Sequence, residues 1–113
     1  MPKLWGYAGV ALLMGFGSAY AQQPATTDEI KALVVGKEFG VSNIGIATYK
    51  ADGRYEFYGL NGGGTSRGKY SITEDRICVD FNMGWKRCDQ ILKDGGKYYL
   101  KNARGTTYEL APR

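Results

Sequence analysis

Two cysteines and the absence of histidine limit the chemistry that this 113-residue chain can perform. Cys78 and Cys88 lie much farther apart than the Cys-x-x-Cys spacing of a redox-active pair. A metal site would need further soft ligands, and the chain has no histidine to supply them. The sequence therefore predicts a structural disulfide between Cys78 and Cys88, and it predicts no metal site and no cofactor.

The spacing around the two cysteines also predicts how their strands pair. Residues 82–84 read Asn-Met-Gly, and a three-residue hairpin loop favours a glycine in the left-handed conformation at its last position. Such a loop places Cys78 opposite Cys88, within the distance that a disulfide spans. The same register pairs an aromatic with an aromatic residue and an acid with a base, as Phe81–Trp85 and Asp80–Lys86.

Other motifs and acidic residues do not indicate catalysis. Residues 63–69 read G-x-x-x-x-G-K, the start of a phosphate-binding loop, but Tyr70 stands where Ser or Thr would hold magnesium. Without histidine there is no imidazole to activate a nucleophile. The acidic residues weighed for acid–base chemistry fall in expected turns or on solvent-facing strand positions, namely Asp52, Asp75, Asp94, Glu56 and Asp80. We therefore expect a protein that is not an enzyme.

Aromatic residues are numerous and offer a binding surface instead. The chain has nine tyrosines, four phenylalanines and two tryptophans, and most of them are expected to pack in the core and across strands. One face of a curved sheet, or the mouth of a barrel, would remain free for a ligand. The candidate binding aromatics are Tyr55, Phe57, Tyr58 and Trp85.

A glycine-rich segment supplies a second candidate. Residues 61–67 are polar and rich in glycine, and we expect them to form a protruding loop. Its candidate contact residues are Thr65, Ser66 and Arg67.

The elements that position these residues are one short helix and about eight strands. Thr26 and Glu29 have the spacing of a capping box, and Ile30 and Val34 share one helical face. From Lys37 onward the apolar pattern alternates, with turn signals roughly every 8 to 12 residues. We expect residues 22–25 to be disordered, and the Asp52-Gly53 turn to have positive φ at both positions. The predicted fold class is mainly β, a small antiparallel meander or barrel-like domain over residues 22–113, with closure left open.

The first 21 residues have the three parts of a secretory signal peptide. Lys3 gives a basic start, residues 4–16 form an apolar run, and Ala-Tyr-Ala ends at Ala21. The run is shorter than the roughly 20 residues of a membrane span. We expect cleavage after Ala21, a periplasmic or secreted product, and no stable membrane span after cleavage.

The charge of the mature chain is mild and well mixed. The full chain carries +4 at pH 7, and loss of Lys3 leaves +4 − 1 = +3. Acidic and basic residues are interspersed, so we expect no nucleic-acid partner and at most a weak preference for anionic surfaces.

The order of several short motifs resembles that of small exported bacterial proteins of unknown function. These motifs are Gly-Lys-Glu-Phe at residues 36–39, Asp-Gly at 52–53, Gly-Lys-Tyr at 68–70, Asp-Arg-Ile-Cys at 75–78, and Cys88. The resemblance implies a short helix followed by an antiparallel meander with one disulfide, and it transfers no active site. Exported eight-stranded lysozyme inhibitors are similar in shape alone.

These observations predict an exported, non-catalytic β-domain that binds a small apolar ligand or an envelope partner. The alternative is a proteinaceous inhibitor, or interaction protein, that acts on an extracellular hydrolase through residues 61–67.

Overall fold

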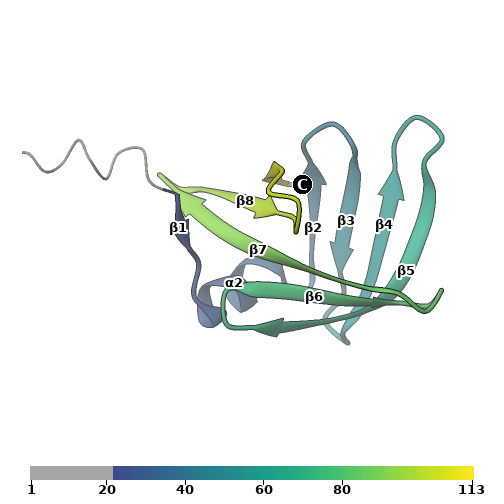
Figure 1. The fold of residues 1–113 in the computed structure, drawn as a ribbon, viewed down its shortest axis with the longest axis horizontal. Helices are drawn as coiled ribbons and strands as arrows, with labels where there is room; N and C mark the ends of the chain where they lie inside the picture. Colours follow the sequence, from purple (N-terminus) through teal and green to yellow (C-terminus); the bar gives the residue numbers. More distant parts are fainter. Residues whose placement is uncertain (1–21) are drawn as a thin grey trace, which may run out of the picture.

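The computed structural model describes residues 22–113, which form an eight-stranded antiparallel barrel with one short helix (Figure 1). The elements follow one another as β1 (Gln23–Pro24), α2 (Thr27–Val34), β2 (Lys37–Val41), β3 (Gly45–Tyr49), β4 (Arg54–Gly59), β5 (Gly64–Thr73), β6 (Arg76–Phe81), β7 (Lys86–Asp94), β8 (Lys97–Lys101) and β9 (Thr107–Pro112). The predicted fold class is confirmed. The predicted signal peptide lies outside the described residues.

The barrel closes through one pairing between strands that are distant in sequence, that of β2 with β9. Strands β2 to β7 pair with their neighbours in chain order, and β2 also pairs with β9. Pairing of β9 with β8, and of β8 with β7, completes the ring. The sheet is therefore closed, which settles the question that the sequence left open. Because the strands are antiparallel, the loops β2–β3, β4–β5 and β6–β7 all lie at the end opposite α2.

The β6–β7 hairpin has the register that the cysteine spacing predicts. Cys78 pairs with Cys88 and Asp80 with Lys86, and a disulfide joins the two cysteines. The backbone N–H of Phe81 donates to the Trp85 carbonyl at 2.8 Å, and the two rings stack with centroids 4.1 Å apart. All three predicted pairs are confirmed.

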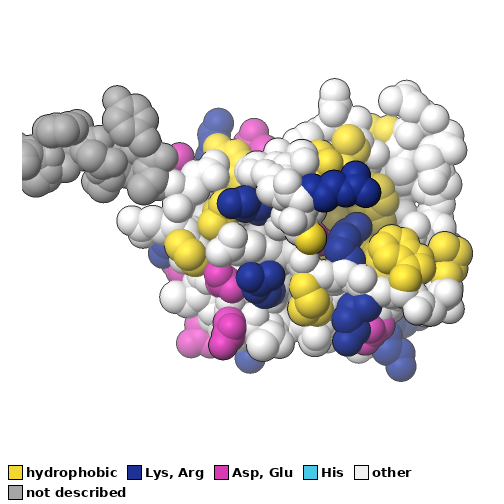
Figure 2. Space-filling model, viewed as in Figure 1, with side chains coloured by type: hydrophobic (Ala, Val, Ile, Leu, Met, Phe, Trp, Pro, Cys, Tyr) yellow, Lys and Arg dark blue, Asp and Glu magenta, His cyan; other side chains and the backbone are white. Residues whose placement is uncertain are grey.

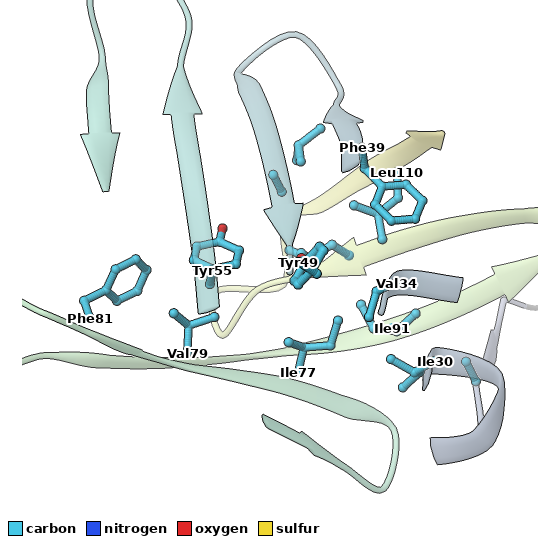
Figure 3. Packing of buried hydrophobic residues seen from close by; sticks show 14 residues of the cluster. Ile30, Val34, Phe39, Tyr49, Tyr55, Ile77, Val79, Phe81, Ile91 and Leu110 are labelled. Atoms are coloured by element: carbon cyan, nitrogen blue, oxygen red, sulfur yellow. The ribbon is translucent and has the colours of Figure 1, made fainter. Parts of the chain in front are cut away.

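Helix α2 covers one end of the barrel. The predicted capping box is present, because Thr26 Oγ1 accepts from the Glu29 N–H at 3.1 Å and Glu29 Oε1 accepts from the Thr26 N–H at 2.9 Å. Ile30 and Val34 are fully buried and point into the barrel, at the end opposite to Phe81 (Figure 3). Hydrophobic burial of this face therefore closes the barrel at this end.

Two local expectations were wrong. Gln23–Pro24 pair with β7, and Ala25 donates its N–H to the Ile91 carbonyl at 2.9 Å, so this segment is ordered by the strand beside it. In the β3–β4 turn only Gly53 has positive φ, at 94°. Asp52 acts there through its carboxylate, which accepts from the Arg54 N–H at 3.1 Å.

Candidate binding site at the open end of the barrel

A cavity of about 160 Å³ lies inside the barrel at the end opposite α2. Most of its walls are apolar or aromatic, contributed by Val41, Ile44, Ala47, Tyr55, Phe57, Leu100 and Tyr108. Three polar side chains complete the lining, namely Arg87, Asp89 and Asn102. Figure 2 shows a hollow between β7 and the β2–β3 hairpin, where Lys or Arg side chains (dark blue) lie beside apolar ones (yellow).

Strand alternation decides which aromatics reach this cavity. Tyr55 and Phe57 are both on the inner face of β4, and both line the cavity. Gly45 makes room for the Phe57 ring, because a Cβ at Gly45 would lie 2.3 Å from Phe57 Cζ. Tyr58 has the opposite parity and is exposed on the outer face.

An ion pair on the inner face of β7 lies at the polar side of the cavity. Arg87 Nε donates to Asp89 Oδ2 at 2.7 Å, and Arg87 Nη2 donates to Tyr55 Oη at 3.4 Å. The side chain of Asp89 is 2% exposed, whereas that of Arg87 is 35% exposed. Asp89 Oδ1 has no hydrogen-bond partner among residues 22–113. Arg87 also lies over the Phe81 ring, 5.4 Å from its centroid.

The surroundings of this pair shift its acid–base properties. Burial raises the pKa of the Asp89 carboxyl above its ordinary value, although the Arg87 guanidinium acts to lower it. Burial acts to lower the pKa of Arg87, but the Asp89 charge and Tyr55 outweigh it and the pKa is raised. Burial also raises the pKa of the Tyr55 hydroxyl. The guanidinium therefore stays charged, and Tyr55 stays a neutral donor and acceptor.

Other hollows on the surface lack such an unpaired group. One of about 340 Å³ beside β4 and β5 is lined by Arg54, Glu56 and Arg67, among others. Three of its charged side chains are already paired: Arg67 Nε lies 3.2 Å from Glu56 Oε2, and Arg54 Nε lies 2.8 Å from Asp52 Oδ2. The cavity at the open end is the one that combines apolar walls with a buried, unpartnered polar atom, so it is the candidate site.

The candidate residues predicted from the sequence do not form one site. Tyr55 and Phe57 meet in the cavity. Trp85 stacks on Phe81 at the rim, half exposed. Tyr58 lies outside, paired across strands with Thr65.

The expected protruding loop over residues 61–67 was wrong. Thr65, Ser66 and Arg67 belong to β5 and pair with β4, and the pairing continues to Gly64 opposite Gly59. Only residues 60–63 form the loop. Strand pairing wins here because it satisfies backbone groups that a protruding loop would leave to water.

Sequence reasoning missed the polar side of the cavity, although a signal was available. The register predicted from the cysteines places Val79 opposite Arg87 and Ile77 opposite Asp89, as observed. Charged residues that share a face with two buried apolar residues are inward-facing, so this register identifies Arg87 and Asp89 as interior.

Exposed apolar side chains surround the same end. Met83 is 79% exposed at the β6–β7 loop, and the others are Ile44, Tyr58, Leu60 and Trp85. They come from three different hairpins, so the rim is apolar around much of the mouth. Val35, just after α2, is the one large exposed apolar residue of the described part of the chain that lies elsewhere.

No three potential metal ligands come together within residues 22–113. Over the same range, no helix has the length and apolar character needed to cross a membrane. Comparisons with protein-family models, with curated proteins and with solved structures find no match.

Proposed function

We propose that this chain is an exported, non-catalytic binding module that takes a small, mostly apolar ligand into the open end of its barrel. The observation that carries this proposal is the cavity whose apolar walls meet the Arg87–Asp89 pair. Ligand pockets have this composition, with mostly apolar walls and a few polar groups that fix orientation.

The size of the cavity limits the ligand. Its volume of about 160 Å³ is close to the roughly 150 Å³ of an engineered cavity that binds benzene. One ring or a short branched chain therefore fits, alone or as the end of a longer molecule.

Two observations support export. The first 21 residues have the pattern of a signal peptide, and Cys78 and Cys88 are joined in a disulfide. Disulfides persist in oxidising compartments such as the periplasm or the exterior. The N-terminus of the isolated protein tests this part: it should begin at Gln22, and a chain that retains Lys3 contradicts export with cleavage.

A titration of the labelled mature protein with toluene tests the binding site. Saturable changes in amide chemical shift are expected in β3, β4 and β7 around the cavity, with none in α2. Ala47→Leu should weaken binding at least tenfold, because Ala47 is buried and lines the cavity. Ala51→Leu is the matched control, since Ala51 is exposed in the β3–β4 turn. Equal binding by both variants would reject the cavity.

The apolar rim supports a second candidate, an envelope protein that covers the open end. Met83→Ser with Leu60→Ser would weaken such a partner and leave toluene binding unchanged, because neither residue lines the cavity. The inhibitor alternative needs another surface, because its protruding loop over residues 61–67 is mostly strand.

A further inference from the structure

We infer that the ligand carries a neutral group that both donates and accepts hydrogen bonds, such as a primary amide or a hydroxyl, beside its apolar part. This inference rests on the proposed function and names the ligand class of the same cavity.

The two oxygens of the Asp89 carboxylate differ in their hydrogen-bond partners. Its Oδ2 accepts from Arg87 Nε at 2.7 Å, while its Oδ1 has no partner among the described residues. Asp89 lines the cavity and is 2% exposed, so Oδ1 is shielded from bulk water. A buried acceptor without a partner is unfavourable, and a ligand donor placed there would remove that penalty.

A second feature of the pair is the donor capacity of Arg87. A guanidinium carries five N–H donors. Arg87 donates two hydrogen bonds, one to Asp89 Oδ2 and one to Tyr55 Oη. The side chain lines the cavity and is 35% exposed, so further N–H groups can reach a ligand acceptor. The cavity therefore presents an acceptor and a donor on neighbouring inner positions of one strand.

The remaining polar lining residue is less available. The Oδ1 atom of Asn102 already accepts from the Arg104 N–H at 3.0 Å and the Thr106 N–H at 2.9 Å. These bonds hold the β8–β9 turn, and they fix the orientation of the Asn102 carboxamide. The Asn102 carbonyl oxygen is therefore not a free acceptor, and a ligand donor is left to Asp89 Oδ1, which has no partner among the described residues.

The opposite charges of Arg87 and Asp89 decide which charge the ligand can carry. An anionic ligand would gain from Arg87 but would be repelled by Asp89, and a cationic ligand would meet the reverse. An apolar ligand would leave Oδ1 without a partner. A neutral amide can give its N–H to Asp89 Oδ1 and receive an N–H from Arg87 at its carbonyl, so it satisfies both.

Four single-ring probes separate these cases in one NMR titration series at pH 7: benzamide, benzoate, benzylammonium and toluene. Benzamide is expected to bind at least tenfold more tightly than either charged probe, and severalfold more tightly than toluene. A charged probe that equals benzamide overturns the inference. Toluene equal to benzamide also overturns it, yet leaves the proposed function standing. Absence of saturable binding by all four rejects both.

Asp89→Asn tests which atoms make the choice. The carboxamide has almost the same shape but no charge, so Arg87 loses its counter-charge and an anion is favoured. The ratio of benzoate to benzamide affinity should rise at least tenfold. Asp80→Asn is the matched control, because Asp80 pairs with Lys86 on the exposed face of the same hairpin. An unchanged ratio in Asp89→Asn overturns the inference.

A second variant guards against misfolding of the first. The double change Arg87→Leu with Asp89→Leu removes both charges together, which is better tolerated than removing one partner of a buried pair. The preference for benzamide over toluene should then disappear. Its persistence would show that other groups recognise the amide, which overturns the assignment to Arg87 and Asp89.

Discussion

The two ends of this barrel are built on opposite principles. At the α2 end, Ile30 and Val34 are fully buried, and the capping box satisfies backbone groups at the helix start. Lys93 Nζ also lies 2.5 Å from Glu29 Oε2, which ties the helix to β7. At the open end, a cavity remains and Asp89 Oδ1 is buried without a partner.

Under the proposed function, the contrast separates stability from ligand binding within one closed sheet. Apolar burial at the α2 end lowers the free energy of the folded state. An unpartnered buried oxygen at the open end raises it. Sites that bind ligands commonly retain such unfavourable features, because the ligand relieves them. The two ends should therefore respond differently to substitution and to a change of pH.

The largest loss of stability is expected when a buried side chain at the α2 end is truncated. Ile30→Ala should lower the free energy of unfolding by roughly 2–5 kcal/mol, because a fully buried side chain leaves a cavity. Ile44→Ala at the open rim should cost well under half as much, because Ile44 is already 41% exposed and borders a cavity. Urea unfolding followed by circular dichroism measures both. Equal losses would contradict the division between the ends.

Removal of the disulfide is expected to weaken the whole barrel without changing its fold. The Cys78–Cys88 bond closes a short loop on the outer face, and the chain-entropy model gives about 3 kcal/mol for a loop of this size. Cys78→Ser with Cys88→Ser should therefore lower the melting temperature and keep the far-UV spectrum. Two reactive thiols in the isolated protein, before any reductant is added, would contradict the bond itself.

Acidification is expected to act on the two ends with opposite signs. The hydrogen bond from Lys93 is the main cause that lowers the pKa of Glu29 below 4.5, so the stability it contributes is present above that value and is lost as pH falls. Burial raises the pKa of Asp89 above 3.8, so its ionised form destabilises the folded state and protonation relieves this as pH falls.

Two variants separate these contributions. Unfolding free energies are measured from pH 7 down to about pH 3, the range that spans ordinary carboxyl pKa values. Glu29→Gln should make the loss of stability on acidification shallower. Asp89→Asn should make the loss steeper, because Asp89 is the one carboxyl group whose pKa is clearly raised. The pKa is lowered for the other carboxyl groups with a clear shift, which are Glu29, Asp52 and Glu56. If the free energy of unfolding falls with pH at the same slope in both variants, the two ends do not respond to acid with opposite signs.

The parts of the fold that were predictable from the sequence depend on near neighbours. The capping box needs only Thr26 and Glu29, three positions apart. The Cys78–Cys88 register needs only a three-residue loop between two strands. In both cases the residue types specify the geometry locally, so no knowledge of distant contacts was required.

The remaining features depend on contacts that no local residue pattern specifies. Closure rests on the pairing of β2 with β9, and no local pattern marks those partners. The glycine-rich composition of residues 61–67 favours a loop, but pairing with β4 draws Thr65 into a strand. The cavity needs the full ring, because its walls come from six strands and from the β2–β3 and β8–β9 turns.

The smallest effect is expected at the apolar rim. Met83 is 79% exposed at the tip of the β6–β7 hairpin, and exposed side chains of this kind change the free energy of unfolding by about 0.5 kcal/mol or less. Met83→Ser should therefore leave the urea midpoint almost unchanged, in contrast to Ile30→Ala. A loss of 2 kcal/mol or so, as a buried side chain gives, would mean that Met83 packs against the barrel in solution. In that case the mouth is covered by its own hairpin, and the two ends are more alike than their structures imply.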